Sequence, residues 1–147
     1  MSTYLTSVLR KRLEDADDHL CVYCQTSVGN TGQPLTIDHV TPQSAGGETE
    51  FENLGLACRR CNEFKGGTII AKDPLTGEEM PLFHPRRDQW NQHFTWDATG
   101  TRLIGLTAIG RATILALAMN DETIVGARRR WVSAGWHPPH RPFARNS

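Results

Sequence analysis

Hydrophobic residues near the start of the chain recur at the spacing of an amphipathic helix. The pattern predicts a helix over residues 3–18, with an apolar stripe formed by Leu5, Val8, Leu9 and Leu13. Two short apolar stretches, at 35–40 and 54–57, predict strands. A further helix is predicted to start at 58–65, and two glycines follow it. The polar segments between these elements are predicted as loops, at 21–34 and 41–52.

The second half of the chain predicts hairpins and two helices. The stretch "DPLTG" at 73–77 indicates a turn between two extended pieces. A second turn at 98–100 separates "HFTWD" from "TRLIGLT", which is typical of a hairpin. Thr107 and Asp121 each precede apolar residues at helical spacing, so both are predicted N-caps. The last stretch, 137–147, is rich in proline and shows neither the helical nor the strand spacing of hydrophobic residues.

Length and composition indicate one folded domain, and the predicted strands and helices indicate the α+β class. The chain has 147 residues, of which 38% are hydrophobic and 22% charged, so global disorder is excluded. We expect four parts: an N-terminal helix at 1–20, a core at 21–70, a C-terminal extension at 71–136 and a proline-rich tail at 137–147. No apolar run reaches the length of a membrane span, and the start lacks a secretory signal. We therefore expect a cytoplasmic protein without a membrane partner, and the pattern indicates no particular oligomeric state.

Charge is unevenly distributed along the chain, although the formal net charge is zero. Residues 1–83 hold 7 Lys or Arg against 12 Asp or Glu, whereas residues 84–147 hold 9 against 4. All nine cations of the second part are arginines, three of them consecutive at 128–130. Arginine makes bidentate contacts to phosphate, so this segregation is compatible with a nucleic-acid partner. For any single arginine a solvated helix face is the favoured interpretation.

The four cysteines form two close pairs. Cys21 and Cys24 are separated by two residues, as are Cys58 and Cys61. In a reducing compartment this spacing predicts a four-thiolate metal site before disulfides. Structural zinc is the favoured metal, while a four-thiolate iron site and two labile disulfides remain alternatives. A catalytic zinc is disfavoured because four protein ligands leave no open position.

The 33-residue segment between the two cysteine pairs contains polar groups suited to catalysis, and one more follows the last cysteine. These residues are Asp38, His39, Asn53 and Asn62. Neighbouring residues on a helix diverge by about 100°, so Cys61 can face the metal while Asn62 faces a second site. Lys65 lies three residues after Asn62 and shares its face.

This arrangement resembles the HNH nucleases, whose fold is the ββα-metal or His-Me finger. The resemblance covers residues 21–66 and depends on four motifs in order, "CVYC", "IDHV", "ENL" and "CRRCNEFKG". It implies metal-dependent hydrolysis of phosphodiester bonds, with DNA as the expected substrate. The later stretch beginning "LFHPR" also resembles the C-terminal extension of small standalone bacterial members.

The resemblance assigns a role to each polar residue. His39 matches the general base that takes a proton from the attacking water. Asp38 and Asn62 match the ligands of one divalent ion, Mg²⁺ or Mn²⁺, and Asn53 matches the residue that holds the loop in place. Lys65, with Arg59 or Arg60 as alternatives, is predicted to contact the non-bridging phosphate oxygens, a role for which the resemblance gives less guidance. Many members have His where this chain has Asn62, and an amide oxygen is the harder ligand, which suits Mg²⁺.

Two other functions fit the same residues. One is a non-catalytic zinc-binding adaptor for nucleic acid or protein, and the other is an iron–thiolate redox protein. A geometric difficulty also remains: adjacent residues of a regular strand point to opposite faces, so Asp38 and His39 need a twist or a strand end to share one pocket. The other histidines are assigned no role, and the four tryptophans are expected to fill the space between hairpin and helices.

Overall fold

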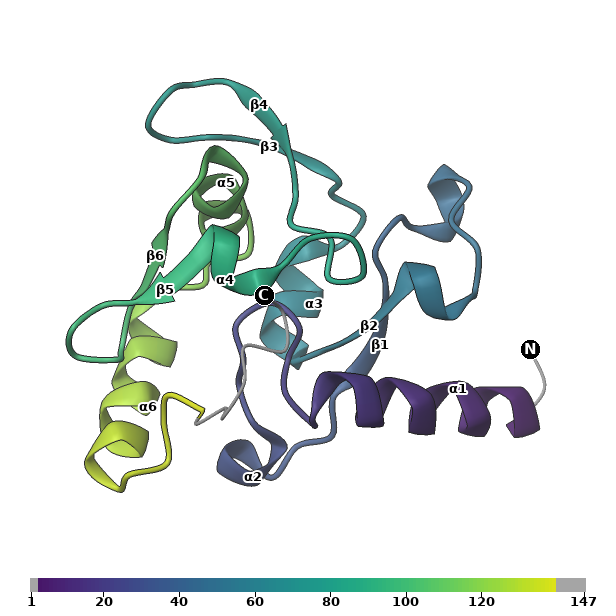
Figure 1. Cartoon of the computed structure of the whole chain (residues 1–147), viewed down its shortest axis with the longest axis horizontal. Helices are drawn as coiled ribbons and strands as arrows, with labels where there is room; N and C mark the ends of the chain where they lie inside the picture. The colour runs from purple at the N-terminus through teal and green to yellow at the C-terminus, as the bar shows by residue number, and fades with distance from the viewer. Residues whose placement is uncertain (1–2, 140–147) are drawn as a thin grey trace.

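The computed structural model describes residues 3–139, and His140 and the rest of the predicted tail lie outside this range. The helices are α1 (Thr3–Asp17), α2 (Val28–Thr31), α3 (Arg59–Lys65), α4 (Trp90–His93), α5 (Ala108–Ala116) and α6 (Glu122–Ser133), with two 3-10 turns, η1 (Gln43–Ala45) and η2 (Phe51–Asn53). The strands are β1 (Thr36–His39), β2 (Leu54–Ala57), β3 (Ile70–Lys72), β4 (Glu79–Pro81), β5 (Phe94–Trp96) and β6 (Leu103–Gly105). They form three two-stranded antiparallel sheets (Figure 1).

This mixture of helices and small sheets confirms the predicted α+β class. Both predicted caps are present: the side chain of Thr107 accepts from the amide of Gly110, and that of Asp121 accepts from the amide of Thr123. The single-turn helices α2 and α4 were not predicted, because one turn is too short to show a helical period. The helix that Thr107 caps ends at Ala116.

The strands β1 and β2 form the hairpin on which the polar residues lie. Their register runs from Thr36 opposite Ala57 to His39 opposite Leu54. All four residues of β2 are buried, because α1 packs on this strand. At the end of α1, the carboxylate of Asp17 accepts a hydrogen bond from the amide of Leu56. The hairpin is thereby fixed against the N-terminal helix.

One cluster of buried hydrophobic residues links the two halves of the described chain. It includes Leu13 of α1, Leu54 and Leu56 of β2, and residues after the hairpins such as Leu117 and Met119. At its centre are the aromatic rings of Phe83, Trp90 and Phe94, with neighbouring centroids 5.2–5.3 Å apart. The C-terminal extension therefore packs against the cysteine-containing half.

The β3–β4 hairpin, at the top of Figure 1, is joined to α5 by a buried carboxylate. Asp73 accepts from two nitrogens of Arg111, at 2.9 and 3.0 Å. Its carboxylate also accepts from the amide of Leu75 and the hydroxyl of Thr76, which fixes the predicted 73–77 turn. One side chain thus shapes the turn and attaches it to the helix.

Three interpretations of the C-terminal half need correction. Arg128 was read as part of a basic surface run, but it is fully buried. His137 was placed in an irregular tail without a role, but it is 5% exposed and packs edge-on against Trp96 and Trp131. Trp136 was expected to fill the interior, but it is 61% exposed. In each case packing between distant segments, which local pattern does not report, decided the outcome.

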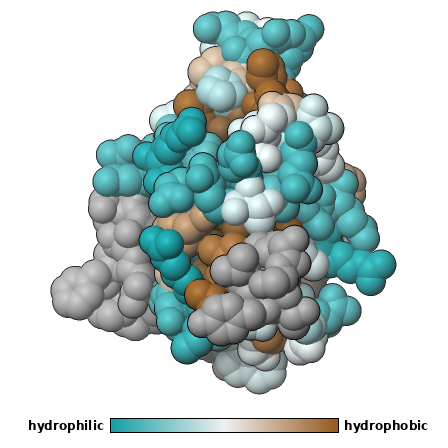
Figure 2. All heavy atoms as spheres, turned by 90° about the vertical axis from the view of Figure 1, so that its right-hand side faces the viewer, coloured by the Kyte–Doolittle hydropathy of each residue, from teal (hydrophilic) through white to brown (hydrophobic). Residues whose placement is uncertain are grey.

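The surface seen from the right-hand side of Figure 1 is mainly hydrophilic, with small hydrophobic areas between the polar side chains (Figure 2). Within residues 3–139, no helix combines the length and the apolar character that crossing a membrane requires.

Candidate metal centre and active site

The four cysteine thiols converge on one point between the two cysteine pairs, Cys21–Cys24 and Cys58–Cys61, which together are called the clamp below. Their sulfur atoms all lie within 4.8 Å of one another, and Sγ of Cys24 is 3.6 Å from Sγ of Cys58. A tetrahedral ion with 2.3 Å bonds to sulfur separates its ligands by about 3.8 Å, so the cluster fits zinc. Cys58 also caps α3, because its sulfur accepts from the amide of Cys61. The residues that begin the helix therefore also position two ligands.

Burial makes negative charge on these thiols unfavourable unless a metal ion is bound. Cys21, Cys24 and Cys61 are buried, and burial raises the pKa of the Cys21 thiol. Hydrogen bonds from the other three cysteines lower the pKa of Cys24, and the hydroxyl of Thr26 lies 3.0 Å from its sulfur. Several thiolates cannot be held together in a dry interior without positive charge. A bound ion would supply that charge.

Beside the clamp, Asp38 lies at the centre of a buried polar group. Its carboxylate accepts a 2.8 Å hydrogen bond from the hydroxyl of Tyr23 and lies 3.3 Å from Nζ of Lys65 through each of its two oxygens. Lys65 is 1% exposed and also donates to the carbonyl of His39 at 3.2 Å. Burial raises the pKa of Asp38, while Lys65 and Tyr23 oppose this shift. Lys65 thus links α3 to two consecutive residues of β1.

The imidazole of His39 has a different neighbour. Its Nε2 lies 2.9 Å from the hydroxyl of Thr49, which also accepts from the side-chain amide of Gln43 at 3.3 Å. The β1–β2 pairing continues regularly through His39. Asp38 and His39 accordingly have different side-chain partners, in keeping with the alternation of a regular strand.

The loop between the strands is held by Asn53. Its side chain accepts from the amide of Thr41 and donates to the carbonyls of Thr41 and Glu48, at 2.9–3.0 Å. Gly47 makes this closure possible, because a Cβ there would lie 1.8 Å from the carbonyl oxygen of Thr41. The segment that carries Thr49 is therefore tied to the end of β1.

The remaining predicted ligand is Asn62, on α3. Its side chain is half-buried, and among residues 3–139 it has no hydrogen-bond partner. The neighbouring Cys61 is buried in the thiol cluster. Carboxylate and amide oxygens suit a hard divalent ion, so the donor chemistry of Asp38 and Asn62 fits the expected metal. An ion that reaches Asp38 has to replace the ammonium group of Lys65.

Comparison with known proteins agrees with this geometry. Residues 21–67 match the HNH endonuclease family model. Searches of curated proteins and of solved structures found no match. The matched range, called the HNH segment below, contains all four cysteines and every residue to which the resemblance assigned a role. The resemblance to this family is thereby confirmed, and residues after the HNH segment lie outside the match.

A groove adjoins the HNH segment next to Lys65, with a volume of about 350 Å³. Its polar lining consists of Thr41 and Lys65 of the HNH segment and of His84, Arg87 and Asp88 of the extension. The apolar part of its lining consists of Val40, Ile69, Ile70, Pro81, Leu82 and Ile109. Burial, followed by the charge of Arg87, lowers the pKa of His84. This groove combines apolar walls with charged groups of both signs, Lys65, Arg87 and Asp88.

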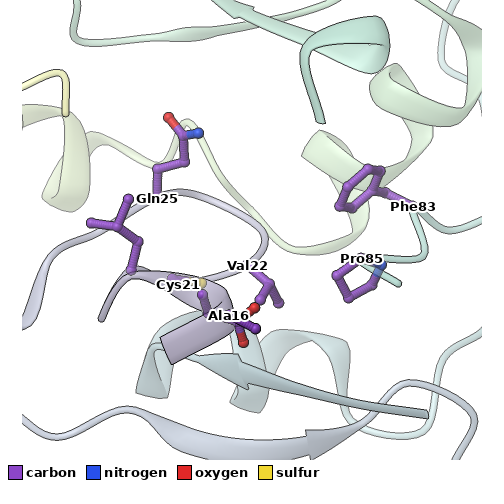
Figure 3. A pocket seen from close by; sticks show the side chains of 8 residues that line it. Ala16, Cys21, Val22, Gln25, Phe83 and Pro85 are labelled. Atoms are coloured by element: carbon purple, nitrogen blue, oxygen red, sulfur yellow. The ribbon is translucent and has the colours of Figure 1, made fainter. Parts of the chain in front are cut away.

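A second cavity is too small to hold a substrate. It lies where Ala16 of α1, Cys21 and Val22 face Phe83 and Pro85, and its volume is about 20 Å³ (Figure 3). That volume accommodates a water molecule. Of these two, the groove beside Lys65 alone is large enough for a substrate.

Sequence reasoning missed three groups at these sites: Tyr23, Thr49 and Arg87. Tyr23 lies inside the "CVYC" motif, so its position was visible but its contact with Asp38, 15 residues away, was not. Thr49 had no distinguishing pattern in a polar loop. Arg87 belonged to the arginine-rich half, and the fold brings it to the groove.

Proposed function

We propose that this protein is a metal-dependent endonuclease that hydrolyses phosphodiester bonds in DNA. The observation that carries the proposal is the HNH match over residues 21–67, which coincides with a buried thiol cluster and the polar residues of β1 and α3. Members of this family are generally nucleases, and DNA is the substrate that the resemblance implies. Structural zinc would hold the hairpin against α3.

His39 is the proposed general base. If its Nε2–H donates to Thr49, the lone pair of Nδ1 is free to take a proton from water. Gln43 and Thr49 would then orient the ring. Asn53 has the supporting role, since its three backbone contacts hold the loop that carries these groups.

The proposed ligands of the catalytic ion are Asp38 and Asn62. A divalent ion such as Mg²⁺ or Mn²⁺ would supply positive charge beside the scissile phosphate. Lys65 neutralises Asp38 in the structure, so its ammonium group has to leave the carboxylate. Once released, Lys65 becomes available to a non-bridging phosphate oxygen, which is its proposed catalytic role.

The groove beside Lys65 supports a nucleic-acid substrate. Its volume of about 350 Å³ and its apolar walls suit a deoxyribose or a base, and Arg87 suits a phosphate. Within residues 3–139, Arg87 has no ion-pair partner. We propose that DNA follows this groove away from the active site. The cytoplasmic location stays a prediction.

Plasmid nicking in the presence of Mg²⁺ tests the proposal. The zinc-loaded parent is expected to nick supercoiled DNA, and His39→Ala is expected to lose this activity while keeping its zinc. His19→Asn is a matched control, because His19 is exposed and its left-handed backbone (φ 57°) is tolerated by Asn. Equal nicking by the parent and His39→Ala would refute the catalytic assignment.

One observation favours the adaptor as a second candidate. Asp38 is already neutralised by a buried lysine, which is an arrangement that needs no ion. If the parent binds DNA or a protein but nicks no DNA with Mg²⁺ or Mn²⁺, the adaptor is the better description.

A further inference from the structure

Arg128 of α6 is a buried charge without a carboxylate partner among residues 3–139. Its side chain is fully buried, and its Nη1 donates to the carbonyl of Thr101 at 3.0 Å. The guanidinium carbon lies 5.1 Å from the ring centroid of Trp96. The other two nitrogens, Nε and Nη2, are buried and have no hydrogen-bond partner. A guanidinium left in this state is strongly destabilising, so a compensating group is required.

Among residues 3–139, the cysteine cluster is the group near Arg128 that can become negatively charged. Trp96, which covers the guanidinium, donates from its Nε1 to Gln25, the residue after Cys24. Cys24 and Cys61 both act to raise the pKa of Arg128, against burial and the charge of Arg60. The attraction to Cys24 is electrostatic rather than a completed hydrogen bond, because Nε and Nη2 meet no acceptor in bonding geometry.

His137, which also lies near Arg128, cannot compensate the charge. Burial and the nearby Arg128 lower the pKa of His137 to about 4, so the imidazole is neutral at physiological pH. Its two ring nitrogens are also buried without partners. The interior between α6 and the clamp therefore contains a cation, a neutral ring and four thiols.

Metal loading changes the charge of the thiols. Four thiolates carry four negative charges and Zn²⁺ carries two positive ones, so the loaded centre is a dianion. Thiolate sulfurs accept hydrogen bonds from charged donors, and such donors near a metal site stabilise its ligands. A dianion matches both the charge and the unused N–H groups of Arg128.

We propose that Arg128 is the counter-charge of the zinc–thiolate centre and donates Nε–H or Nη2–H to its sulfurs. The metal then connects the HNH segment to α6, which lies outside the family match. The C-terminal extension is in this way part of the metal site. This inference does not depend on nuclease activity.

Zinc affinity, measured by competition with a chromophoric chelator, tests the proposal. Arg128→Met keeps the apolar length of the side chain and removes its charge and donors. It is expected to bind zinc 10–100-fold more weakly, the range found for groups that support metal ligands. Arg129→Met is the matched control, because Arg129 is the next residue of α6 and is exposed. The zinc affinity of Arg129→Met should stay within about twofold of that of the parent in the same competition assay.

Cobalt(II) in place of zinc gives an independent readout. The thiolate-to-cobalt charge-transfer band is expected to shift in Arg128→Met and to stay unchanged in Arg129→Met. If Arg128→Met does not fold, Arg128→Lys is used instead. Lysine has a shorter side chain without the planar guanidinium group, so this variant should also bind zinc more weakly and shift the cobalt band. Zinc affinity within twofold of the parent, together with an unshifted cobalt band, would overturn the proposal for whichever variant folds.

Discussion

Replacing Lys65 by Met removes the cation that neutralises Asp38. The two side chains form a buried pair, with Nζ 3.3 Å from each carboxylate oxygen and side-chain exposures of 1% and 5%. Met has nearly the same length and no charge, so the substitution keeps most of the packing. Asp38 would retain the hydroxyl of Tyr23 as a partner.

The expected loss in the free energy of unfolding follows from two arguments. Removing one partner of a buried ion pair costs about 3–5 kcal/mol. Protonation limits this cost, since neutralising a carboxyl group of ordinary pKa at pH 7 costs about 4 kcal/mol. We therefore expect Lys65→Met to be about 3–4 kcal/mol less stable than the parent at pH 7.

Urea unfolding with saturating zinc measures this difference. Lys72→Met is the control, because Lys72 is exposed on β3 and should lose less than about 0.5 kcal/mol. Combining Asp38→Asn with Lys65→Met removes both charges and should recover part of the loss, which a double-mutant cycle quantifies.

Acidification provides a second test of the same pair. Loss of the ammonium leaves the hydrogen bond from Tyr23 as the main opposition to burial, so the pKa of Asp38 in the folded variant lies further above its unfolded value. When the pKa of a group is higher in the folded state than in the unfolded state, its contribution to the free energy of unfolding is most favourable at low pH and is lost as pH rises. The deficit relative to the parent should therefore shrink on acidification, by up to about 2.7 kcal/mol between pH 7 and pH 5. A deficit below about 1 kcal/mol at pH 7, or one that grows on acidification, would refute the reasoning.

Three further predictions concern the clamp, the β3–β4 hairpin and the groove. Removing zinc with a chelator should unfold the HNH segment, seen as lost helical circular dichroism that added zinc restores; a retained signal would contradict a structural role. Asp73→Asn should speed amide exchange in the 73–77 turn, because it weakens the contact with Arg111. In the parent, the hydrogen bond from Arg111 holds the pKa of the Asp73 carboxyl well below its usual range. The parent should lose this contribution to stability as pH falls below the unfolded pKa of about 4, and unchanged exchange would contradict the contact. If the protein cuts DNA, Arg87→Ala should raise KM several-fold without making the salt dependence of KM steeper. Arg129→Ala should not raise KM. Equal KM values for the two variants would exclude the groove as the DNA path.

Local signals in the sequence were enough for most of the secondary structure. The strand at 54–57 matches β2 at both ends, and the caps Thr107 and Asp121 start α5 and α6. These features depend on neighbouring residues alone, through periodicity and capping chemistry. One-turn helices such as α2 carry too few residues for a period, so they were missed.

The candidate site was predicted in its residue types but not in its contacts. Spacing alone brought out the four-thiolate cluster, because two intervening residues let both sulfurs of a pair reach one ion. The pairing of Lys65 with Asp38 spans 27 residues and joins a helix to a strand, so no local pattern could indicate it. The bond between His39 and Thr49 likewise depends on how the loop closes.

The sequence by itself determined most of the longer elements, the four-cysteine cluster and the resemblance to the HNH family, because each depends on residues close together along the chain. Only the tertiary structure decided which charges are buried and what faces them. Arg128 has the same local surroundings as Arg129, yet the first is buried under Trp96 and the second is exposed. Solvation and pairing set the energy of a charge, and both depend on segments that meet only when the chain folds.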